Sequence, residues 1–124
     1  MPDARLVILY VDDPVKSAAF YSDLFGRTPL ESSPTFAMIA LTEAMMLGLW
    51  SRHTVEPAAH AAGGGDGEIA FTAKDADEVR VLHADWSRRN LPIVQPPRDM
   101  DFGHTFVALD PDGHRLRVYA PAAP

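Results

Sequence analysis

Apolar residues along the chain alternate between short strand-like runs and stripes with helical spacing. The first run, residues 5–11, is rich in β-branched and aromatic residues and ends at Asp12-Asp13-Pro14, a pattern typical of a helix start. From Pro14 apolar residues recur every three or four positions, and Gly26 stands where a helix commonly ends. The pattern predicts a strand followed by a helix of about three turns.

The same order of elements then occurs a second time. Three apolar stretches separated by turn-like residues predict a strand meander at residues 28–33, 35–41 and 44–52. The second series predicts strands at residues 68–74, 91–97, 104–110 and 115–121, and a helix that begins after Asp75 and carries Val79, Leu82 and Trp86 on one stripe.

The two halves match at an offset of 62 residues, half the chain. Val11 and Asp13 before the first helix correspond to Ala73 and Asp75 before the second. A βαβββ unit written twice predicts an α+β fold with two small antiparallel sheets related by pseudo-twofold symmetry. Because such a sheet cannot bury both faces unaided, we expect the sheets to curl around a shared space, which is the candidate site.

The chain has the length of one domain, 124 residues and 13.6 kDa. Glycines and alanines that cannot pack a core interrupt it after the first meander. We expect one module at about 1–55, a linker or flexible loop at about 56–66, and a second module at about 67–124.

Charge and composition exclude several classes of function. A net charge of −6 and a pI near 5.2 argue against a nucleic-acid partner, because proteins that bind nucleic acids cluster Lys and Arg. The absence of cysteine leaves His, Asp and Glu as the strong metal ligands. The N-terminal apolar run is too short for a signal peptide or a membrane helix, so we expect a cytoplasmic protein without a membrane partner.

The last predicted strand carries two arginines. Strand side chains alternate between the two faces of a sheet, so Arg115, Arg117 and Tyr119 are expected to share one face.

Four segments resemble the vicinal oxygen chelate superfamily, which includes glyoxalases, extradiol dioxygenases and bleomycin-resistance-type binding proteins. They are VDDPVKSAAFY with the LFG that follows it, GEIAFTAKDADEV and DPDGHRLRVYAP. The resemblance covers nearly the whole chain. It implies paired βαβββ modules with cupped mixed sheets and a homodimer of the domain-swapped type.

The resemblance also implies positions for metal ligands. In metal-dependent relatives these positions carry His or acidic residues, and here they fall on Leu6, near Leu47, on Glu68 and on Arg117. Leucine offers no donor atom and a guanidinium has no lone pair, so Glu68 alone could hold a metal. We therefore expect no metal cofactor, and an ion pair between Arg117 and Glu68, because a buried charge is costly without a partner.

Other residues are candidates for contact with an organic ligand, although core packing is an alternative for each. The stretch 36–50 is rich in Met and aromatic residues, which adapt to or stack on flat molecules. Alternation is expected to place His104 on one face with Phe102 and Phe106. The candidate ligand-binding residues are Phe36, Met38, Met46, Leu47, Trp50, Glu68, Phe102, His104, Phe106, Arg117 and Tyr119.

Three functions remain open from the sequence. The first is a metal-free binding protein that sequesters a planar hydrophobic aromatic metabolite or antibiotic, as the resemblance to phenazine- and bleomycin-resistance proteins implies. The second is a metal-dependent lyase, isomerase or dioxygenase that uses Glu68 with His104. The third is a small interaction or scaffold module with a filled cup, which would bind no ligand. No residues suggest a catalytic nucleophile, so the sequence favours binding over catalysis.

Overall fold

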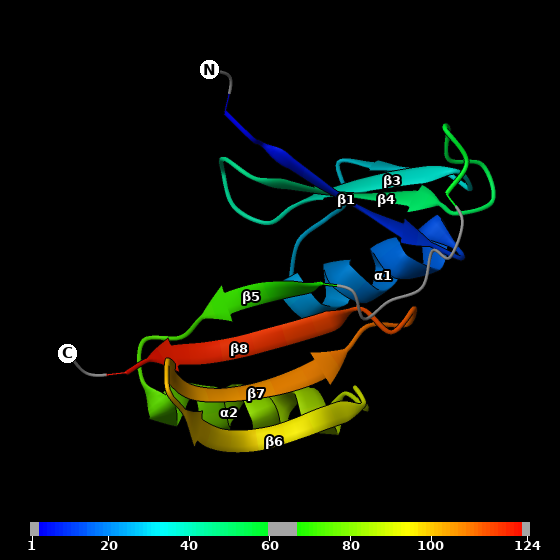
Figure 1. Cartoon of the computed structure of the whole chain (residues 1–124). Coiled ribbons are helices and arrows are strands. Elements are labelled where there is room, and N and C mark those ends of the chain that lie inside the picture. Colours follow the sequence, from blue (N-terminus) through cyan, green and yellow to red (C-terminus); the bar gives the residue numbers. More distant parts are fainter. Residues whose placement is uncertain (1–2, 60–66, 123–124) are drawn as a thin grey trace. The chain divides into compact units, whose positions relative to one another are not determined.

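The computed structural model describes residues 3–59 and 67–122 and divides the chain into two compact units, Met1–Ala62 and Gly63–Pro124. Each unit contains one helix and one four-stranded mixed sheet (Figure 1). The predicted α+β fold with two βαβββ modules is confirmed. The expected linker at 56–66 lies largely outside the described residues.

Unit one contains β1 (Leu6–Val11), α1 (Pro14–Phe25), β2 (Glu31–Ser32), β3 (Phe36–Ala40) and β4 (Met46–Ser51). The strand order is β1-β4-β3-β2. The β1–β4 pair is parallel and the other pairs are antiparallel, so the sheet is mixed rather than purely antiparallel. A parallel pair needs a long crossover connection between its two strands, and here α1, β2 and β3 form that connection.

Local sequence fixes both ends of α1. The Asp13 side chain accepts a hydrogen bond from the backbone N–H of Lys16 at 3.2 Å, and Pro14 occupies the first turn, where a missing N–H costs nothing. Gly26 closes the helix in the left-handed region at φ 66°. The helix predicted from residue 14 to Gly26 is confirmed.

Unit two repeats this order with β5 (Glu68–Thr72), α2 (Ala76–Arg88), β6 (Ile93–Met100), β7 (Gly103–Leu109) and β8 (Arg115–Pro121). Its strand order is β5-β8-β7-β6, again with a parallel first pair. Asp75 caps α2 by accepting from the Glu78 N–H at 2.8 Å, and Glu78 in turn accepts from the Lys74 N–H at 3.0 Å.

The strand β6 is longer than the sequence predicts. The expected strand ends at the prolines of residues 91–97, but β6 continues to Met100 through a register shift between Gln95 and Arg98. Proline cannot donate a hydrogen bond to a neighbouring strand, and here Pro96 and Pro97 fall inside that irregularity on an edge strand.

One face of each sheet packs against the helix of its own unit. In unit two the alternate β8 residues Leu116, Val118 and Ala120 are buried, and Trp86 of α2 meets the ring of Phe106 with centroids 5.3 Å apart. In unit one Leu47, Leu49 and Ile39 are fully buried on the equivalent face. Alternation then sends the other set of side chains to the opposite face of each sheet.

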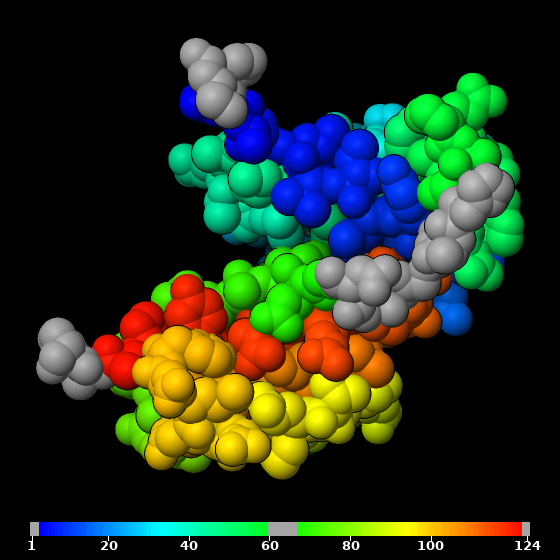
Figure 2. Space-filling view, viewed as in Figure 1, coloured from blue at the N-terminus to red at the C-terminus, as the bar shows by residue number. Residues whose placement is uncertain are grey.

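The edge strand β1 is apolar and exposed. Leu6, Val7 and Ile8 are 45, 41 and 38% exposed, and the atoms of this segment, dark blue in Figure 2, lie at the surface of unit one. None of the helices in the described ranges is long and apolar enough to cross a membrane.

Candidate functional site

The face of the second sheet opposite α2 gathers most of the charged residues predicted for the site. Cross-strand pairing places side chains of neighbouring residues on the same face, and here it forms three rows. The rows are Glu68, Arg115 and Leu109; Ala70, Arg117, Val107 and Gln95; and Thr72, Tyr119, Thr105 and Arg98. The predicted common face of Arg115, Arg117 and Tyr119 is confirmed.

Arg117 is held at the centre of this face by two neighbours. Its Nε donates to Glu68 Oε1 at 2.6 Å, and its Nη1 donates to Thr105 Oγ1 at 3.2 Å. The Thr105 hydroxyl donates in turn to the Val118 carbonyl at 2.8 Å, which fixes its free lone pairs toward the guanidinium. The Arg117 side chain is only 16% exposed. The predicted Glu68–Arg117 ion pair is therefore confirmed.

The ring of Phe102 lies against the same guanidinium, and Tyr119 packs against that ring. Phe102 lies in the turn between β6 and β7, and the Arg117 Cζ atom is 5.5 Å from the centre of its ring. The Phe102 ring also meets Tyr119 edge to face at 6.1 Å. A cation over an aromatic face is attracted by the ring quadrupole, so this cluster combines positive charge with flat apolar area. Phe102 is 43% exposed.

The face of the first sheet opposite α1 is apolar. Strand register places four of the candidate ligand-binding residues there, namely Phe36, Met38, Met46 and Trp50. The rings of Phe36 and Trp50 meet edge to face with centroids 6.1 Å apart. Leu47 belongs to the other face and is fully buried toward α1, so its assignment to the ligand-binding set is wrong and it serves the core.

The register also corrects the position equivalent to Arg117 in unit one. Arg117 pairs with Ala70 of β5, and the residue of β4 that pairs with Ile8, the counterpart of Ala70 at the 62-residue offset, is Gly48 rather than Leu47. Gly48 leaves room for the Phe36 ring, because an added Cβ would lie 3.1 Å from Phe36 Cζ. A ring in one unit thus covers the position that a guanidinium occupies in the other.

His104 does not share a face with Phe102, so the predicted common face is wrong. His104 pairs with Ala120 and, like Phe106, lies on the α2 side, while Phe102 belongs to a turn where strand alternation ends. Phe106 is fully buried against Trp86 and the His83 ring, so it belongs to the core and not to a ligand site.

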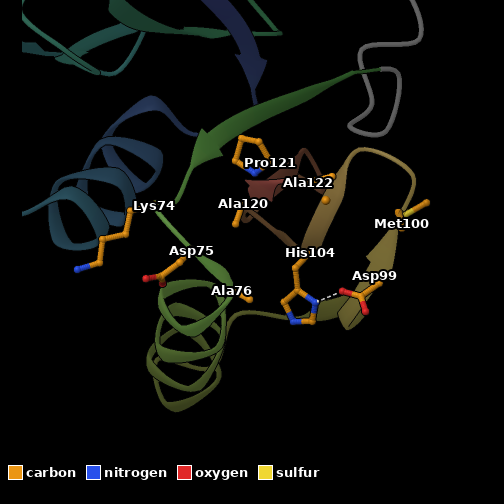
Figure 3. Close-up of a pocket in the computed structure, with 10 residues that line it drawn as sticks. Lys74, Asp75, Ala76, Asp99, Met100, His104, Ala120, Pro121 and Ala122 are labelled. Atoms are coloured by element: carbon orange, nitrogen blue, oxygen red, sulfur yellow. Dashed lines mark hydrogen bonds and ion pairs between the residues drawn. The ribbon is translucent and has the colours of Figure 1, made fainter. Parts of the chain in front are cut away.

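A hollow of about 430 Å³ lies on this α2 side of unit two (Figure 3). His104 Nδ1 is hydrogen-bonded to Asp99 Oδ1 at 2.7 Å, as the dashed line shows, and Lys74, Asp75 and Pro121 line the same hollow. His104 Nε2 is buried without a hydrogen-bond partner among the described residues. The Asp99 side chain, by contrast, is 93% exposed.

The residues present do not fit a metal centre. Glu68 and His104 lie on opposite faces of the same sheet, so they cannot bind one ion, and their joint use as ligands is wrong. Nowhere in residues 3–59 and 67–122 do three His, Asp or Glu side chains converge on a possible cation position. Carried onto the fold, the family's ligand positions hold Leu6, Gly48, Glu68 and Arg117.

Three further residues of the charged face are absent from the predicted site. Alternation with Arg117 indicated Arg115 at the level of sequence, but nothing in that pattern linked it to a ligand. Thr105 lies in a mostly apolar strand, and nothing in the sequence indicated that its hydroxyl would contact Arg117. Arg98 could not be placed, because the register shift at the two prolines decides which face it joins.

Comparison with known proteins agrees with this architecture. Residues 5–118 match the model of the Glyoxalase/Bleomycin resistance protein/Dioxygenase superfamily. The chain is 27% identical over 117 residues to the phenazine antibiotic resistance protein EhpR of Enterobacter agglomerans, an alignment that covers 92% of this chain and 88% of EhpR.

Solved structures agree as well. A protein of Agrobacterium tumefaciens whose solution structure was determined by NMR is 50% identical, with a TM-score of 0.89 over 99% of this chain and all of that one. A glyoxalase-related enzyme from Fulvimarina pelagi has a TM-score of 0.82 at 19% identity, over 97% of this chain and 88% of that one, and so supports the fold alone.

Proposed function

The chain belongs to the Glyoxalase/Bleomycin resistance protein/Dioxygenase superfamily, and we propose that it is a binding protein for planar aromatic small molecules, acting without a metal. Its role would be to sequester a phenazine-like metabolite or antibiotic and so to confer resistance. The observation that carries the proposal is the Arg117 guanidinium, paired with Glu68, at a position where a metal-dependent relative needs a carboxylate.

The two sheet faces opposite the helices supply the chemistry that binding requires. Flat molecules gain affinity from apolar area removed from water, about 25 cal/mol per Å², and Phe36, Trp50 and Phe102 offer such area. Arg117 adds directional donors, because its two observed hydrogen bonds use two of the five guanidinium N–H groups.

The curated relative supports the same class of ligand. EhpR is named for resistance to a phenazine antibiotic, and a phenazine is a flat three-ring aromatic. The metal-dependent alternative has weaker support in this chain, because only Glu68 among the family's ligand positions offers a donor.

The test uses the two tryptophans. Trp50 lies on the face opposite α1, whereas Trp86 is 5% exposed in the core of unit two. Phenazine should quench the fluorescence of the Trp86→Phe variant with micromolar affinity, and quenching should be lost in Trp50→Phe. Absence of binding to any planar aromatic at high micromolar concentration would refute the proposal.

Metal dependence is tested in parallel. Protein purified without chelator should contain no stoichiometric zinc, nickel, manganese or iron, and dialysis against EDTA should leave phenazine binding unchanged. A stoichiometric metal whose removal abolishes binding would favour a metal-dependent enzyme instead.

A further inference from the structure

We infer that the face opposite α2 selects anionic planar aromatics, in particular aromatic carboxylates, over neutral ones. This inference rests on the proposed function and narrows it to a class of ligand. It depends on Arg98 and Arg115 as well as on Arg117.

The charge balance of this face is opposite to that of the chain. The chain has a net charge of −6, yet strand register places Arg98, Arg115 and Arg117 on this face. Among the residues of unit two that the structure describes, Glu68 is the one carboxylate that register places beside them, and it is bound to Arg117. The strand residues of this face therefore carry three guanidinium groups and one carboxylate, a net charge of +2.

Arg98 and Arg115 are available to a ligand. Both are exposed, and the side chain of neither forms a hydrogen bond or an ion pair with another described residue. Arg115 lies two residues from Arg117 along β8, about 7 Å at the usual strand rise. Arg98 lies in the same cross-strand row as Tyr119.

The neighbours of these arginines favour an aromatic anion over a free phosphate. Phe102 and Tyr119 provide flat apolar area within the same cluster, so a ring could lie on the aromatics while its carboxylate reaches a guanidinium. Guanidinium and carboxylate groups match in bidentate geometry, and such charge-assisted hydrogen bonds are stronger than neutral ones. A small inorganic anion would leave the aromatic area unused.

The experiment compares phenazine with phenazine-1-carboxylate by isothermal titration calorimetry on the full chain. The carboxylate should bind at least about tenfold more tightly, as expected for one charged hydrogen bond. The preference should shrink as NaCl is raised from low to high concentration, since exposed charges are screened within about 10 Å at 0.1 M.

Two variants locate the preference. Arg115→Gln and Arg98→Gln should each reduce the ratio of the two affinities to about threefold or less. The matched control is Arg80→Gln on α2, which removes the same charge from the other side of the sheet and should keep the ratio unchanged. Circular dichroism of each variant verifies the fold.

The possible failures are distinguishable. If neither compound binds, the proposed function itself is wrong. If both bind with equal affinity, the proposed function stands and the selectivity for anions is refuted. If the carboxylate is preferred but Arg115→Gln and Arg98→Gln retain the full ratio, the assignment to this face is overturned. If inorganic phosphate displaces phenazine-1-carboxylate at an equal concentration, the aromatic rings add nothing to binding. That result also overturns the inference.

Discussion

Arg117 and Glu68 stabilise each other in a position that neither would occupy alone. The Glu68 side chain is 33% exposed, so solvent weakens the ion pair. Arg117 is nearly buried, however, and removal of the Glu68 carboxylate would leave its charge without a partner. We expect Glu68→Ala to lower the free energy of unfolding by about 1–2 kcal/mol, measured by urea denaturation.

A double-mutant cycle with Arg117→Ala separates this coupling from other effects of the substitutions, and it should give about 1 kcal/mol. The exposed pair Arg80–Asp77 on α2 is the matched control, with an expected coupling below about 0.5 kcal/mol. Equal couplings for the two pairs would contradict a special role for the Arg117 environment.

His114 couples proton binding to the turn that precedes β8. Asp110 is buried and accepts hydrogen bonds from the backbone N–H groups of Asp112 and His114 and from His114 Nδ1 at 2.8 Å. The hydrogen bond to the Asp110 carboxylate raises the pKa of His114 above its ordinary 6.5 and outweighs the opposite effect of burial.

This raised pKa predicts the pH dependence of stability. Folding then favours the protonated imidazole, so its contribution is complete below about pH 6.5 and is lost as the pH rises through the higher pKa of the folded state. The difference in free energy of unfolding between wild type and His114→Asn should therefore fall as the pH increases from 6 to 9. A constant difference, measured by urea denaturation at each pH, would contradict the coupling.

The start of β7 depends on a glycine. Gly103 has φ 149°, and a Cβ there would lie 1.9 Å from the Ala120 carbonyl oxygen of β8. Gly103→Ala should destabilise unit two by at least about 2 kcal/mol, because the backbone must move apart at the strand pair beside Phe102.

Gly67→Ala, which meets no atom within 4 Å, is the control for this substitution and should change the unfolding midpoint little. Similar midpoints for the two variants in urea, with unchanged far-UV circular dichroism, would show that β7 and β8 can adapt.

The spacing of apolar residues was sufficient to predict the order of helices and strands. It also predicted the charged face of the second sheet. Alternation along β8 identified the shared face of Arg115, Arg117 and Tyr119, because side chains of a regular strand point in turn to its two faces. Alternation gave the wrong face for Phe102, because this residue lies in a turn. It could not place Arg98, because the register shift between Gln95 and Arg98 depends on pairing with β7.

In unit one, strand alternation puts Leu47 on the opposite face from Met46 and Trp50, so these candidates could not all contact one ligand. Only the packing of α1 could decide which set was buried. Hydrophobicity gave no help, because nearly every residue of that strand is apolar and either face could have been the core.

Unit one has an apolar edge strand with exposed side chains. β1 is an edge strand of its sheet, and Leu6, Val7 and Ile8 are each more than a third exposed. Unprotected apolar edges promote association, which soluble proteins normally prevent with charges or by pairing. We expect a homodimer that covers this edge, with a mass in sedimentation equilibrium of twice 13.6 kDa.

Val7→Lys places a charge on that edge, on the side away from the candidate ligand residues of β3 and β4, and should weaken dimerisation by at least about tenfold. Val81→Lys is the matched control, because Val81 is 66% exposed and lies on the helix α2, not on an edge strand. It should leave the dimer intact. A wild-type chain that sediments at 13.6 kDa at micromolar concentration would refute the dimer. Equal weakening by both variants would assign the interface elsewhere, because association through the exposed β1 strand should respond to a charge on β1 and not to one on α2.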